Sequence, residues 1–448
     1  MNDTRFSIVI PTRNRHKTLY HCLRTCVAQM FHSFEIIVCD NCSSPETRRT
    51  VESFESEKIK YIRSDVPLAM SQNWELAISH AEGEYIILIG DDDGLLLNSL
   101  WKIDQLLKVL GVRALSWIHV GYNWPNSIIA TNKLTIPLVV RNEVLQSREV
   151  ISNYADCKAG LPFLPGLYHS AIHKDLIALL REKTGRVFDA LSHDVYAGFA
   201  FAYLAQSYVM IGAPMSIDGH SVESGHCNVL YAKDSPALKE FDALNIKAHI
   251  VCHPQIPDVP VAPAIIADSF QRAKDALFPR DKISVNRKKL VIRCIESLRE
   301  RYRRGIDGDE EWRRHLGKIH DSLADDARLQ RWFDSNFKNP VVQDVDLPKW
   351  RQLLKKCDRK FFADRSNESG SSNGFEKGFD ETSGNLVLNA SDFGLRNVFD
   401  VAEFCEKFYN TDINRLKWHY QKIGLDRSML IRKARSQIEE LLYCSGRR

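Results

Sequence analysis

Three consecutive carboxylates, Asp91, Asp92 and Asp93, follow Gly90 and the short apolar run 85–89. Like charges this close raise one another's pKa and destabilise a fold unless a cation neutralises them. Oxygen ligands after a strand suit Mg²⁺ or Mn²⁺, which usually bind one or two protein carboxylates together with substrate phosphates. An acidic turn is the alternative, because Asp beside Gly is typical of turns. The cluster alone leaves both interpretations open.

The residues before the cluster predict strands that alternate with helices. Apolar runs predict strands at 6–12, 34–40, 59–62 and 85–89, and helical patterns lie between them, at 46–54 and 71–81 among others. The strand residues are continuously apolar, which favours a parallel sheet covered by helices on both faces. The proline at position 11 is expected to stop the first strand.

Polar side chains fall at the carboxyl ends of three of these strands. Thr12 ends the first, Asp40 ends the second, and the three aspartates follow the fourth. Ligands of such sheets bind beyond the carboxyl ends of the strands. The pattern therefore predicts one binding site built from these residues rather than three unrelated loops.

The motifs that carry a family resemblance lie in order over roughly the first half of the chain. They are Ile8-Val9-Ile10-Pro11-Thr12-Arg13-Asn14-Arg15, Ile36-Ile37-Val38-Cys39-Asp40-Asn41, Asn73-Trp74, Gly83-Glu84-Tyr85 and Asp91-Asp92-Asp93. This set resembles family-2 glycosyltransferases of the GT-A fold. The resemblance implies an α/β nucleotide-sugar-binding fold, a mostly parallel sheet between helices, here followed by a mainly helical C-terminal extension.

The resemblance also implies roles for residues near the first two strand ends. Pro11, Thr12, Asn14 and Asp40 would bind the nucleotide, with Asp40 at the base. Arg13 departs from the family pattern, because an aromatic residue is common at its position.

The same resemblance assigns the acidic cluster to a Mn²⁺ or Mg²⁺ cofactor held by Asp91, Asp92 and Asp93. The family often shows Asp-x-Asp-Asp, and in that register Gly90 replaces the first aspartate. Asp92 would then be the metal ligand and Asp91 a nucleotide-binding residue that contacts the ribose. The other register, Asp91-x-Asp93, stays open.

An inverting sugar transfer needs a base for the acceptor hydroxyl, and a carboxylate within hydrogen-bond reach can serve. Asp194 precedes the helical run 196–204 and resembles the family's base, although a helix cap is the alternative. Asp189 is the substitute candidate, and His193 could orient Asp194. Farther along, the turn-rich stretch 212–225 contains His220, which could approach the phosphates or the metal, as could His226.

The sequence predicts four units. They are a GT-A domain at 1–231, a Pro-containing connector and basic helical region at 232–365, a flexible linker at 366–385 and a C-terminal helical segment at 386–448. The basic stretch 272–304 could contact an anionic membrane or could be the solvated face of an ordinary helix.

Composition agrees with an enzyme that has a large core, since 44% of the 448 residues are hydrophobic. The net charge of +4 does not imply nucleic acid by itself. We expect no signal peptide, and the uncharged stretch 195–217 reads better as a buried helix and strand than as a membrane span. The eleven scattered cysteines fit reduced thiols. We therefore expect a cytoplasmic protein, peripheral at the inner membrane face if 272–304 binds lipid.

Together with the resemblance, these features predict a metal-dependent, inverting, hexosyltransferase-like enzyme that moves a sugar from a nucleotide-diphosphate donor to a hydroxyl of a glycan or lipid-linked acceptor. The resemblance implies that the donor is a UDP-sugar and that the reaction belongs to surface polysaccharide synthesis. A non-catalytic sugar-nucleotide scaffold is one alternative, and a nucleotidyltransferase is another. The latter would usually carry a glycine-rich loop after the first strand, and residues 11–17 contain no glycine. A dinucleotide-binding oxidoreductase is excluded, because no Gly-x-Gly-x-x-Gly follows that strand.

Overall fold

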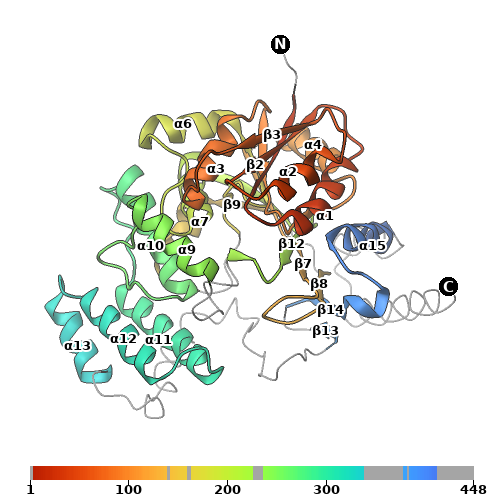
Figure 1. Ribbon diagram of the computed structural model, residues 1–448. Coiled ribbons are helices and arrows are strands. Elements are labelled where there is room, and N and C mark those ends of the chain that lie inside the picture. The colour runs from red at the N-terminus through yellow and green to blue at the C-terminus, as the bar shows by residue number, and fades with distance from the viewer. Residues whose placement is uncertain are drawn as a thin grey trace, which may run out of the picture.

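The computed structural model describes residues 4–138, 142–158, 163–225, 236–337, 377–380 and 383–410, and shows two β-sheets packed among helices (Figure 1). The first part of the chain alternates strands and helices as predicted. Its elements are β1 (Phe6–Thr12), α1 (His16–Val27), β2 (Phe34–Asp40), α2 (Pro45–Glu52), β3 (Ile59–Arg63), α3 (Met70–Ser79) and β4 (Tyr85–Leu88).

The larger sheet also contains β6 (Ala114–Trp117), β9 (Glu143–Gln146), β10 (Ser170–His173) and β11 (Ser207–Ile211). Its eight strands have the order β3-β2-β1-β4-β10-β6-β11-β9. β1 pairs in parallel with β2 and β4, and β2 pairs in parallel with β3. β10 runs antiparallel between β4 and β6. This is the mostly parallel sheet of the GT-A fold that the resemblance implied.

Alternate residues of β1 face opposite sides of this sheet, and helices cover both sides. Besides α1, α2 and α3, these helices are α4 (Ser99–Leu110), α5 (Ser147–Ala155), α6 (Lys174–Thr184) and α7 (His193–Ala205). Val9 lies in an apolar core with residues of α3, α5, α6 and α7, whereas Ile8 and Ile10 lie in the opposite core with α1, α2 and α4. Burial on both faces explains why the strands are continuously apolar in sequence.

The second sheet contains β5 (Gly94–Leu95), β7 (Val120–Asn123), β8 (Lys133–Pro137), β12 (Ser216–His220), β13 (Gly378–Asp380) and β14 (Asn385–Asn389). Their order is β13-β14-β8-β7-β12-β5. The stretch 212–225, predicted to be rich in turns, also forms a strand that extends to His220. That stretch contains β12, which pairs in parallel with β7 and antiparallel with β5.

The carboxy-terminal part of the described chain packs on this second sheet. β14 pairs antiparallel with β8, and a 3₁₀ turn (Ala390–Phe393) leads to α15 (Val398–Asn410). Apolar residues of α15 share a core with β7, β8 and β12, and Figure 1 shows α15 beside α1. The expected helical segment 386–448 thus begins with a strand, and its residues 411–448 lie outside the described part. The expected linker 366–385 is described only at 377–380 and 383–385, where it forms a β-hairpin.

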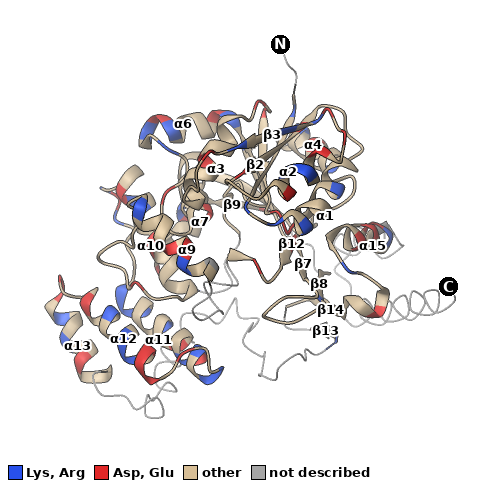
Figure 2. Cartoon of the chain, viewed as in Figure 1, with Lys and Arg blue, Asp and Glu red and all other residues tan. Residues whose placement is uncertain are grey.

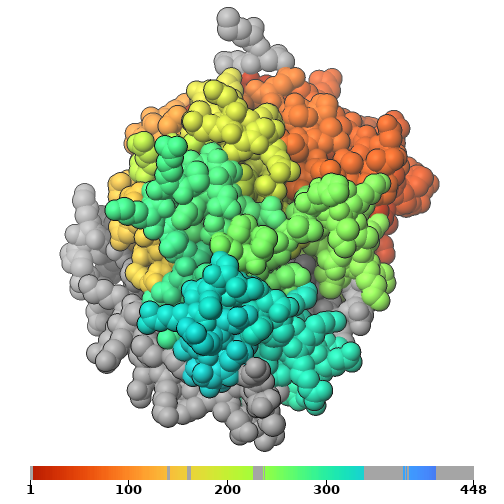
Figure 3. All heavy atoms as spheres, turned by 90° about the vertical axis from the view of Figure 1, so that its left-hand side faces the viewer, coloured from red at the N-terminus to blue at the C-terminus, as the bar shows by residue number. Residues whose placement is uncertain are grey.

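A helical region follows the larger sheet, as predicted, over the described residues 236–337. It consists of α9 (Pro236–Lys247), α10 (Ala262–Leu277), α11 (Arg287–Arg303), α12 (Asp309–Asp321) and α13 (Ala327–Phe337). Phe270 of α10 packs into the core around α7, while α11, α12 and α13 form a core of their own. In Figure 3 the green to cyan atoms of these helices cover a broad part of one face.

The charges of the basic stretch 272–304 are largely paired within the protein. Arg287 Nη2 lies 2.7 Å from Asp325 Oδ1, and Lys289 Nζ lies 2.6 Å from Asp156 Oδ2. Figure 2 shows blue and red side by side on α11, α12 and α13. This mixture fits a solvated helix face that braces the chain better than a single-sign, lipid-facing surface.

The uncharged stretch 195–217 forms most of α7, then β11 and the start of β12, so the expected buried helix and strand are present. Nowhere in the described ranges does a helix combine the length and the apolar character needed to cross a bilayer.

Candidate functional site

The carboxyl ends of β1, β2 and β4 meet at one edge of the larger sheet. Thr12 is in register with Asp40, and Thr12 Oγ1 donates a hydrogen bond to Asp91 Oδ2 at 2.7 Å. β1 spans Phe6–Thr12 as predicted, and the buried Pro11 is its last residue but one. Pairing of β1 with β4 ends earlier, at Val9. The structure thus brings the three predicted strand ends together.

Asp40 is completely buried at the end of β2. Its Oδ1 accepts a hydrogen bond from Ser43 N at 2.9 Å, and its Oδ2 accepts one from the Tyr61 hydroxyl. Arg63 Nε lies 3.7 Å from the same Oδ2. An ionised carboxylate has about four lone-pair positions, so Asp40 can accept a further donor. Tyr61 and Arg63 would therefore help to position Asp40 in any contact with a nucleotide base.

Asn14 links the loops that follow β1 and β2. Its backbone N–H donates to Ser43 Oγ at 2.8 Å, and its Oδ1 accepts from Ser44 N at 2.9 Å. Its φ of 55° is left-handed, a conformation that Asn adopts more readily than most residues. Asn14 therefore shapes the exposed rim of the strand-end site.

Asp91 is almost completely buried and is held by two donors. Besides Thr12, Arg15 contacts it, with Nη1 3.0 Å from Asp91 Oδ1. Burial raises the pKa of the Asp91 carboxyl, while Arg15 and Thr12 act in the opposite direction. Arg15 also donates to the backbone carbonyl of Glu223. The acidic cluster therefore has a permanent cation beside it in space, although none lies near it in sequence.

Asp92 is buried, and burial disfavours the charged form of its carboxyl. Its Oδ2 accepts hydrogen bonds from Ser221 N at 3.2 Å and from Ser221 Oγ at 2.6 Å. Burial, followed by the neighbouring Asp93, raises the pKa of Asp92 to about 7. A carboxyl with this pKa holds a proton for part of the time at neutral pH and would release it to a divalent cation.

Asp93 is turned toward backbone and aromatic donors from other elements. Its Oδ2 accepts from Gly90 N at 2.6 Å and from the Tyr168 hydroxyl at 2.7 Å, and its Oδ1 accepts from Gly219 N at 2.7 Å. A Cβ at Gly90 would lie 2.8 Å from Asp93 Oδ2. A side chain at position 90 would therefore crowd the Asp93 carboxylate, which suits the glycine found there.

Asp194 lies in the first turn of α7 and is partly exposed, with Ser192 Oγ donating to its Oδ1 at 2.9 Å. The N-cap of α7 is Ser192 rather than Asp194. The neighbouring His193 packs edge-on against Trp74, at 4.2 Å between ring centroids, and Trp74 lies 5.8 Å from Tyr168. Because Tyr168 binds Asp93, this row of rings connects the start of α7 to the acidic cluster.

The other predicted residues near Asp194 have structural partners. Asp189 Oδ2 lies 3.3 Å from Arg186 Nη2, and Asp189 Oδ1 lies 3.7 Å from Arg272 Nη1. Burial lowers the pKa of His193 to about 4, so this imidazole is neutral at pH 7. Asp194 is therefore the better placed of the two candidate bases, and His193 packs rather than titrates. His226 lies outside the described residues.

Residues 7–107 match the family model described as glycosyl transferase family 2. This match supports the family-2 resemblance that the sequence motifs carry. This segment contains the predicted nucleotide-binding and acidic-cluster residues, whereas the candidate bases Asp189 and Asp194 and the candidate histidines lie outside it.

Curated relatives agree with this family-2 assignment over part of their length. An Escherichia coli protein named UDP-Glc:alpha-D-GlcNAc-diphosphoundecaprenol beta-1,3-glucosyltransferase WfgD is 26% identical over 149 residues, which are 33% of this chain and 57% of that protein. A Campylobacter jejuni protein named GalNAc(5)-diNAcBac-PP-undecaprenol beta-1,3-glucosyltransferase is 30% identical over 104 residues, 22% of this chain and 34% of that protein. The chain thus spans between a third and somewhat more than half of these relatives.

Among solved structures, residues 1–349 of Staphylococcus aureus TarS in complex with UDP-GlcNAc align with 75% of this chain and 91% of that chain. The identity is 16% and the TM-score is 0.41. An overlap at this level assigns no role to individual residues.

Several residues of this family-2 site were not predicted from sequence. They are Arg15, Tyr61, Tyr168 and Ser221. Arg15 stands in the first motif, three positions after Thr12, and its charge was a usable signal. Tyr61 lies in β3 two residues before Arg63, the partner of Asp40, so its side chain could have been placed on the same face from the strand register. Ser221 comes from the end of β12, and no local pattern links it to Asp92.

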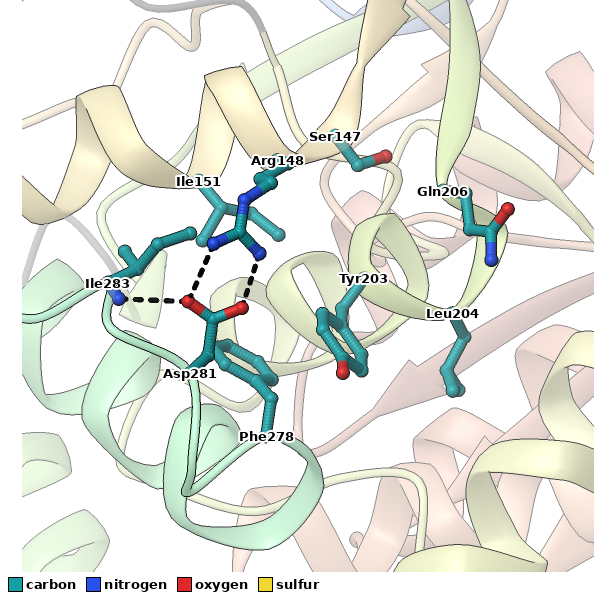
Figure 4. Close-up of a pocket in the computed structure, with 9 residues that line it drawn as sticks. All are labelled: Ser147, Arg148, Ile151, Tyr203, Leu204, Gln206, Phe278, Asp281 and Ile283. Atoms are coloured by element: carbon teal, nitrogen blue, oxygen red, sulfur yellow. Dashed lines mark hydrogen bonds and ion pairs between the residues drawn. The ribbon is translucent and has the colours of Figure 1, made fainter.

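A separate pocket of about 380 Å³ lies between α5, α7 and the loop after α10 (Figure 4). In it, Arg148 Nη2 lies 3.1 Å from Asp281 Oδ1, and the Tyr203 ring stacks on Phe278 with centroids 4.3 Å apart. Tyr203 lies near the carboxyl end of α7, whereas Asp194 lies at its start. The lining residues drawn in Figure 4 include none of the predicted site residues, so this pocket is distinct from the strand-end site.

Proposed function

We propose that the chain is a metal-dependent, inverting glycosyltransferase that moves a sugar from a UDP-sugar to a hydroxyl of a glycan or lipid-linked acceptor. The observation that carries this proposal is the meeting of Thr12, Asp40, Asp91 and Asp92 at adjacent strand ends. Nucleotides bind at this edge in open α/β sheets. The match to glycosyl transferase family 2 supports a sugar nucleotide rather than a dinucleotide as the ligand.

The donor set fits Mg²⁺ or Mn²⁺. Asp91 and Asp92 present buried carboxylates, and the pKa of Asp92, raised to about 7 mainly by burial, indicates a charge that a cation would stabilise. A bound divalent ion would neutralise the charge that develops on the departing nucleoside diphosphate. Arg15, which already contacts Asp91, would add a positive charge on the same side of the site.

Asp40 would recognise the base. A carboxylate accepts a hydrogen bond from uracil N3–H, whereas cytosine has no hydrogen on that nitrogen. Tyr61 and Ser43 would hold the Asp40 carboxylate in place for this contact. Pro11 and Asn14 would shape the neighbouring loop around the nucleotide.

Asp194 would act as the general base. Its side chain lies in the first turn of α7, is partly exposed and accepts a hydrogen bond from Ser192 Oγ. It would accept the proton of the acceptor hydroxyl as that oxygen attacks the anomeric carbon from the side opposite the leaving diphosphate. This direct displacement inverts the anomeric centre.

The names of the relatives support the donor and acceptor classes. WfgD is named for a UDP-Glc donor and a diphosphoundecaprenol acceptor, and the Campylobacter jejuni protein is named for an acceptor linked to PP-undecaprenol. For this chain we accordingly propose a UDP-sugar, an acceptor in surface polysaccharide synthesis and a cytoplasmic site of action. We retain the division at residues 231, 365 and 385 as a proposal, with the hairpin β13–β14 and α15 packed on the catalytic domain.

A screen of nucleotide-sugar hydrolysis tests this function. The full chain is incubated with UDP-, GDP- and CDP-sugars with Mg²⁺, Mn²⁺ or EDTA, and nucleoside diphosphate release is measured. We expect release only with a divalent ion and fastest from a UDP-sugar. Nucleotide binding without any turnover or acceptor transfer would favour the scaffold, whereas pyrophosphate release from a nucleoside triphosphate and a sugar phosphate would favour a nucleotidyltransferase.

A further inference from the structure

Two carboxylates and three imidazoles gather where the acidic loop meets the second sheet. The members of this cluster, called here the Asp-His cluster, are Asp93, His119, His169, Asp218 and His220. Ligand atoms of Asp93, His169 and Asp218 all lie within 4.8 Å of one another. These three residues come from the loop between β4 and β5, the segment before β10 and the middle of β12.

His169 has a buried nitrogen that faces this cluster. The residue is 5% exposed, and its Nδ1 lies 2.8 Å from Ser216 Oγ. Ser216 Oγ also accepts from Trp117 Nε1 at 2.8 Å, and a hydroxyl oxygen has two lone pairs, so it can accept from both rings. In the tautomer with the proton on Nδ1, His169 donates to Ser216 and presents its Nε2 lone pair to the cluster.

That Nε2 atom makes no hydrogen bond, and it lies 3.4 Å from Asp93 Oδ2. A lone pair that faces a carboxylate is unfavourable unless a proton or a metal ion lies between them. A metal-binding imidazole commonly has its other nitrogen held by a hydrogen bond, as Ser216 holds Nδ1 here.

Asp218 is the third member of the set, and it lies beside two further histidines at a point that solvent can reach. Its Oδ2 lies 3.2 Å from His119 Nε2 and 3.6 Å from His220 Nε2. The side chains of Asp218 and His220 are 23% and 26% exposed, so an ion can enter from this side. Either histidine could supply a further ligand.

The backbone fixes the distance between the two sheets at this point. Gly219 N donates to Asp93 Oδ1 at 2.7 Å, and a Cβ at Gly219 would lie 1.8 Å from the carbonyl oxygen of Asp92. No other residue could allow this approach without movement of the chain. Asp93 and Asp218, the latter adjacent to Gly219, are therefore held at a set spacing before any ion binds.

We propose that Asp93, His169 and Asp218 form a binding site for a divalent transition-metal ion of the Zn²⁺ type, which joins the acidic loop to β12. One imidazole nitrogen and two carboxylates suit Zn²⁺, whereas Mg²⁺ and Ca²⁺ prefer oxygen ligands alone. This site goes beyond the proposed sugar transfer, and it requires no nucleotide.

Metal binding by the full chain without nucleotide tests the proposal. The protein is stripped with EDTA, dialysed and titrated with Zn²⁺ by calorimetry, and thermal unfolding is followed with and without Zn²⁺. We expect one equivalent of tightly bound Zn²⁺ and a melting temperature higher by several degrees, because an ion that binds only the folded state stabilises it. Co²⁺ in place of Zn²⁺ should give a visible absorption band that reports the ligand set.

Variants assign the bound ion to this cluster. His169→Asn and Asp218→Asn should each weaken Zn²⁺ binding by at least ~10-fold and change the Co²⁺ band, because each removes one of three ligands. His173→Asn is the matched control, since His173 lies on β10 and pairs with Glu84 outside the cluster. Asp92→Asn should keep the nucleotide-free Zn²⁺ equivalent even where it loses metal-dependent UDP binding, which separates this proposal from the proposed function.

Two results would overturn the proposal. One is a native protein that binds no Zn²⁺ and shows no Zn²⁺-dependent melting shift without nucleotide, which would mean that protons alone neutralise the cluster. The other is native-like Zn²⁺ affinity in both ligand variants. Should His169→Asn fail to fold by circular dichroism, Asp218→Asn decides, because its side chain is partly exposed and a smaller structural effect is expected.

Discussion

Arg15 Nη1 lies 3.0 Å from Asp91 Oδ1, and this ion pair ties the loop after β1 to the loop after β4. Asp91 is 1% exposed, whereas Arg15 retains partial access to solvent. The guanidinium is a permanent charge beside a cluster of three carboxylates. It can stabilise the metal-free site and, without moving far, lie beside the diphosphate of a bound donor.

Replacing Arg15 tests both roles. Arg15→Gln should lower the free energy of unfolding at pH 8 by ~1–3 kcal/mol, the range for losing a hydrogen bond to a buried charged group. The loss should be smaller at pH 4, because burial raises the pKa of Asp91 and the carboxyl is then more protonated. Urea unfolding at the two pH values measures this difference, and equal losses would contradict it. UDP affinity should fall in the same variant.

Asp92 should make metal-dependent UDP binding sensitive to pH. Burial raises the pKa of this carboxyl to about 7, so protons compete with the cation and Mn²⁺-dependent UDP affinity should fall from pH 8 to pH 6. Asp92→Asn should abolish the Mn²⁺ dependence. Calorimetry with UDP, with and without Mn²⁺, measures the effect, and unchanged affinity in the variant would remove Asp92 from the metal site.

The same shift has a consequence for stability that serves as a control. The folded-state pKa of Asp92 lies above its unfolded value, so the folded state holds more protons between about pH 4 and pH 7. Stability without metal should therefore decline as pH rises through this window. Asp92→Asn should reduce that decline. Because the variant must be folded for this to be measured, the same experiment shows that its loss of UDP binding is not caused by unfolding.

Asp40→Ala should weaken UDP binding by ~1–3 kcal/mol, because it removes a charged acceptor for uracil N3–H. Its matched control is Tyr61→Phe, which keeps the ring and removes the hydroxyl that donates to Asp40. This control should have a smaller effect, since Ser43 N still holds the carboxylate. The native protein should also bind UDP more tightly than CDP, and equal affinities would argue against a base contact by Asp40.

The parallel part of the sheet could be predicted because its signals are local. Strands such as 34–40 are apolar on both faces, end in a polar residue and are followed by a helix, so the order of elements and the strand-end residues follow from short windows. The positions of Asp40 and Asp91 at strand ends follow from the sequence in this way.

The second sheet could not be predicted in the same way. β12 is short, contains Asp218 and Gly219, and pairs with β5 and β7 from distant parts of the chain. Its glycine is required by contact with the carbonyl of Asp92, which is a tertiary constraint, yet in sequence it reads as a turn signal. The contact of Ser221 with Asp92 depends on the same long-range pairing.

The basic stretch 272–304 provides a test of its two interpretations. Arg287→Glu and Lys289→Glu each reverse a charge that pairs with an aspartate, and each should destabilise the protein by ~1 kcal/mol or somewhat less. Arg280→Glu, at an exposed position, is the matched control and should have little effect. If the stretch braces the chain, sedimentation with anionic liposomes should be weak at low salt and unchanged by these substitutions. Strong sedimentation that the substitutions abolish would instead support membrane contact.

Asp194→Asn separates catalysis from binding, because it keeps the size of the side chain and removes the base. UDP-sugar binding should survive, and transfer should fall by the ~10²–10⁴-fold that is typical of losing a general base. Asp189→Asn is the matched control, since Asp189 is close in sequence but pairs with Arg186 and Arg272. It should retain most of the transfer rate. If Asp194→Asn transfers sugar normally and Asp189→Asn loses most of its transfer, Asp189 is the base. Asp194 would then have only a structural role at the start of α7.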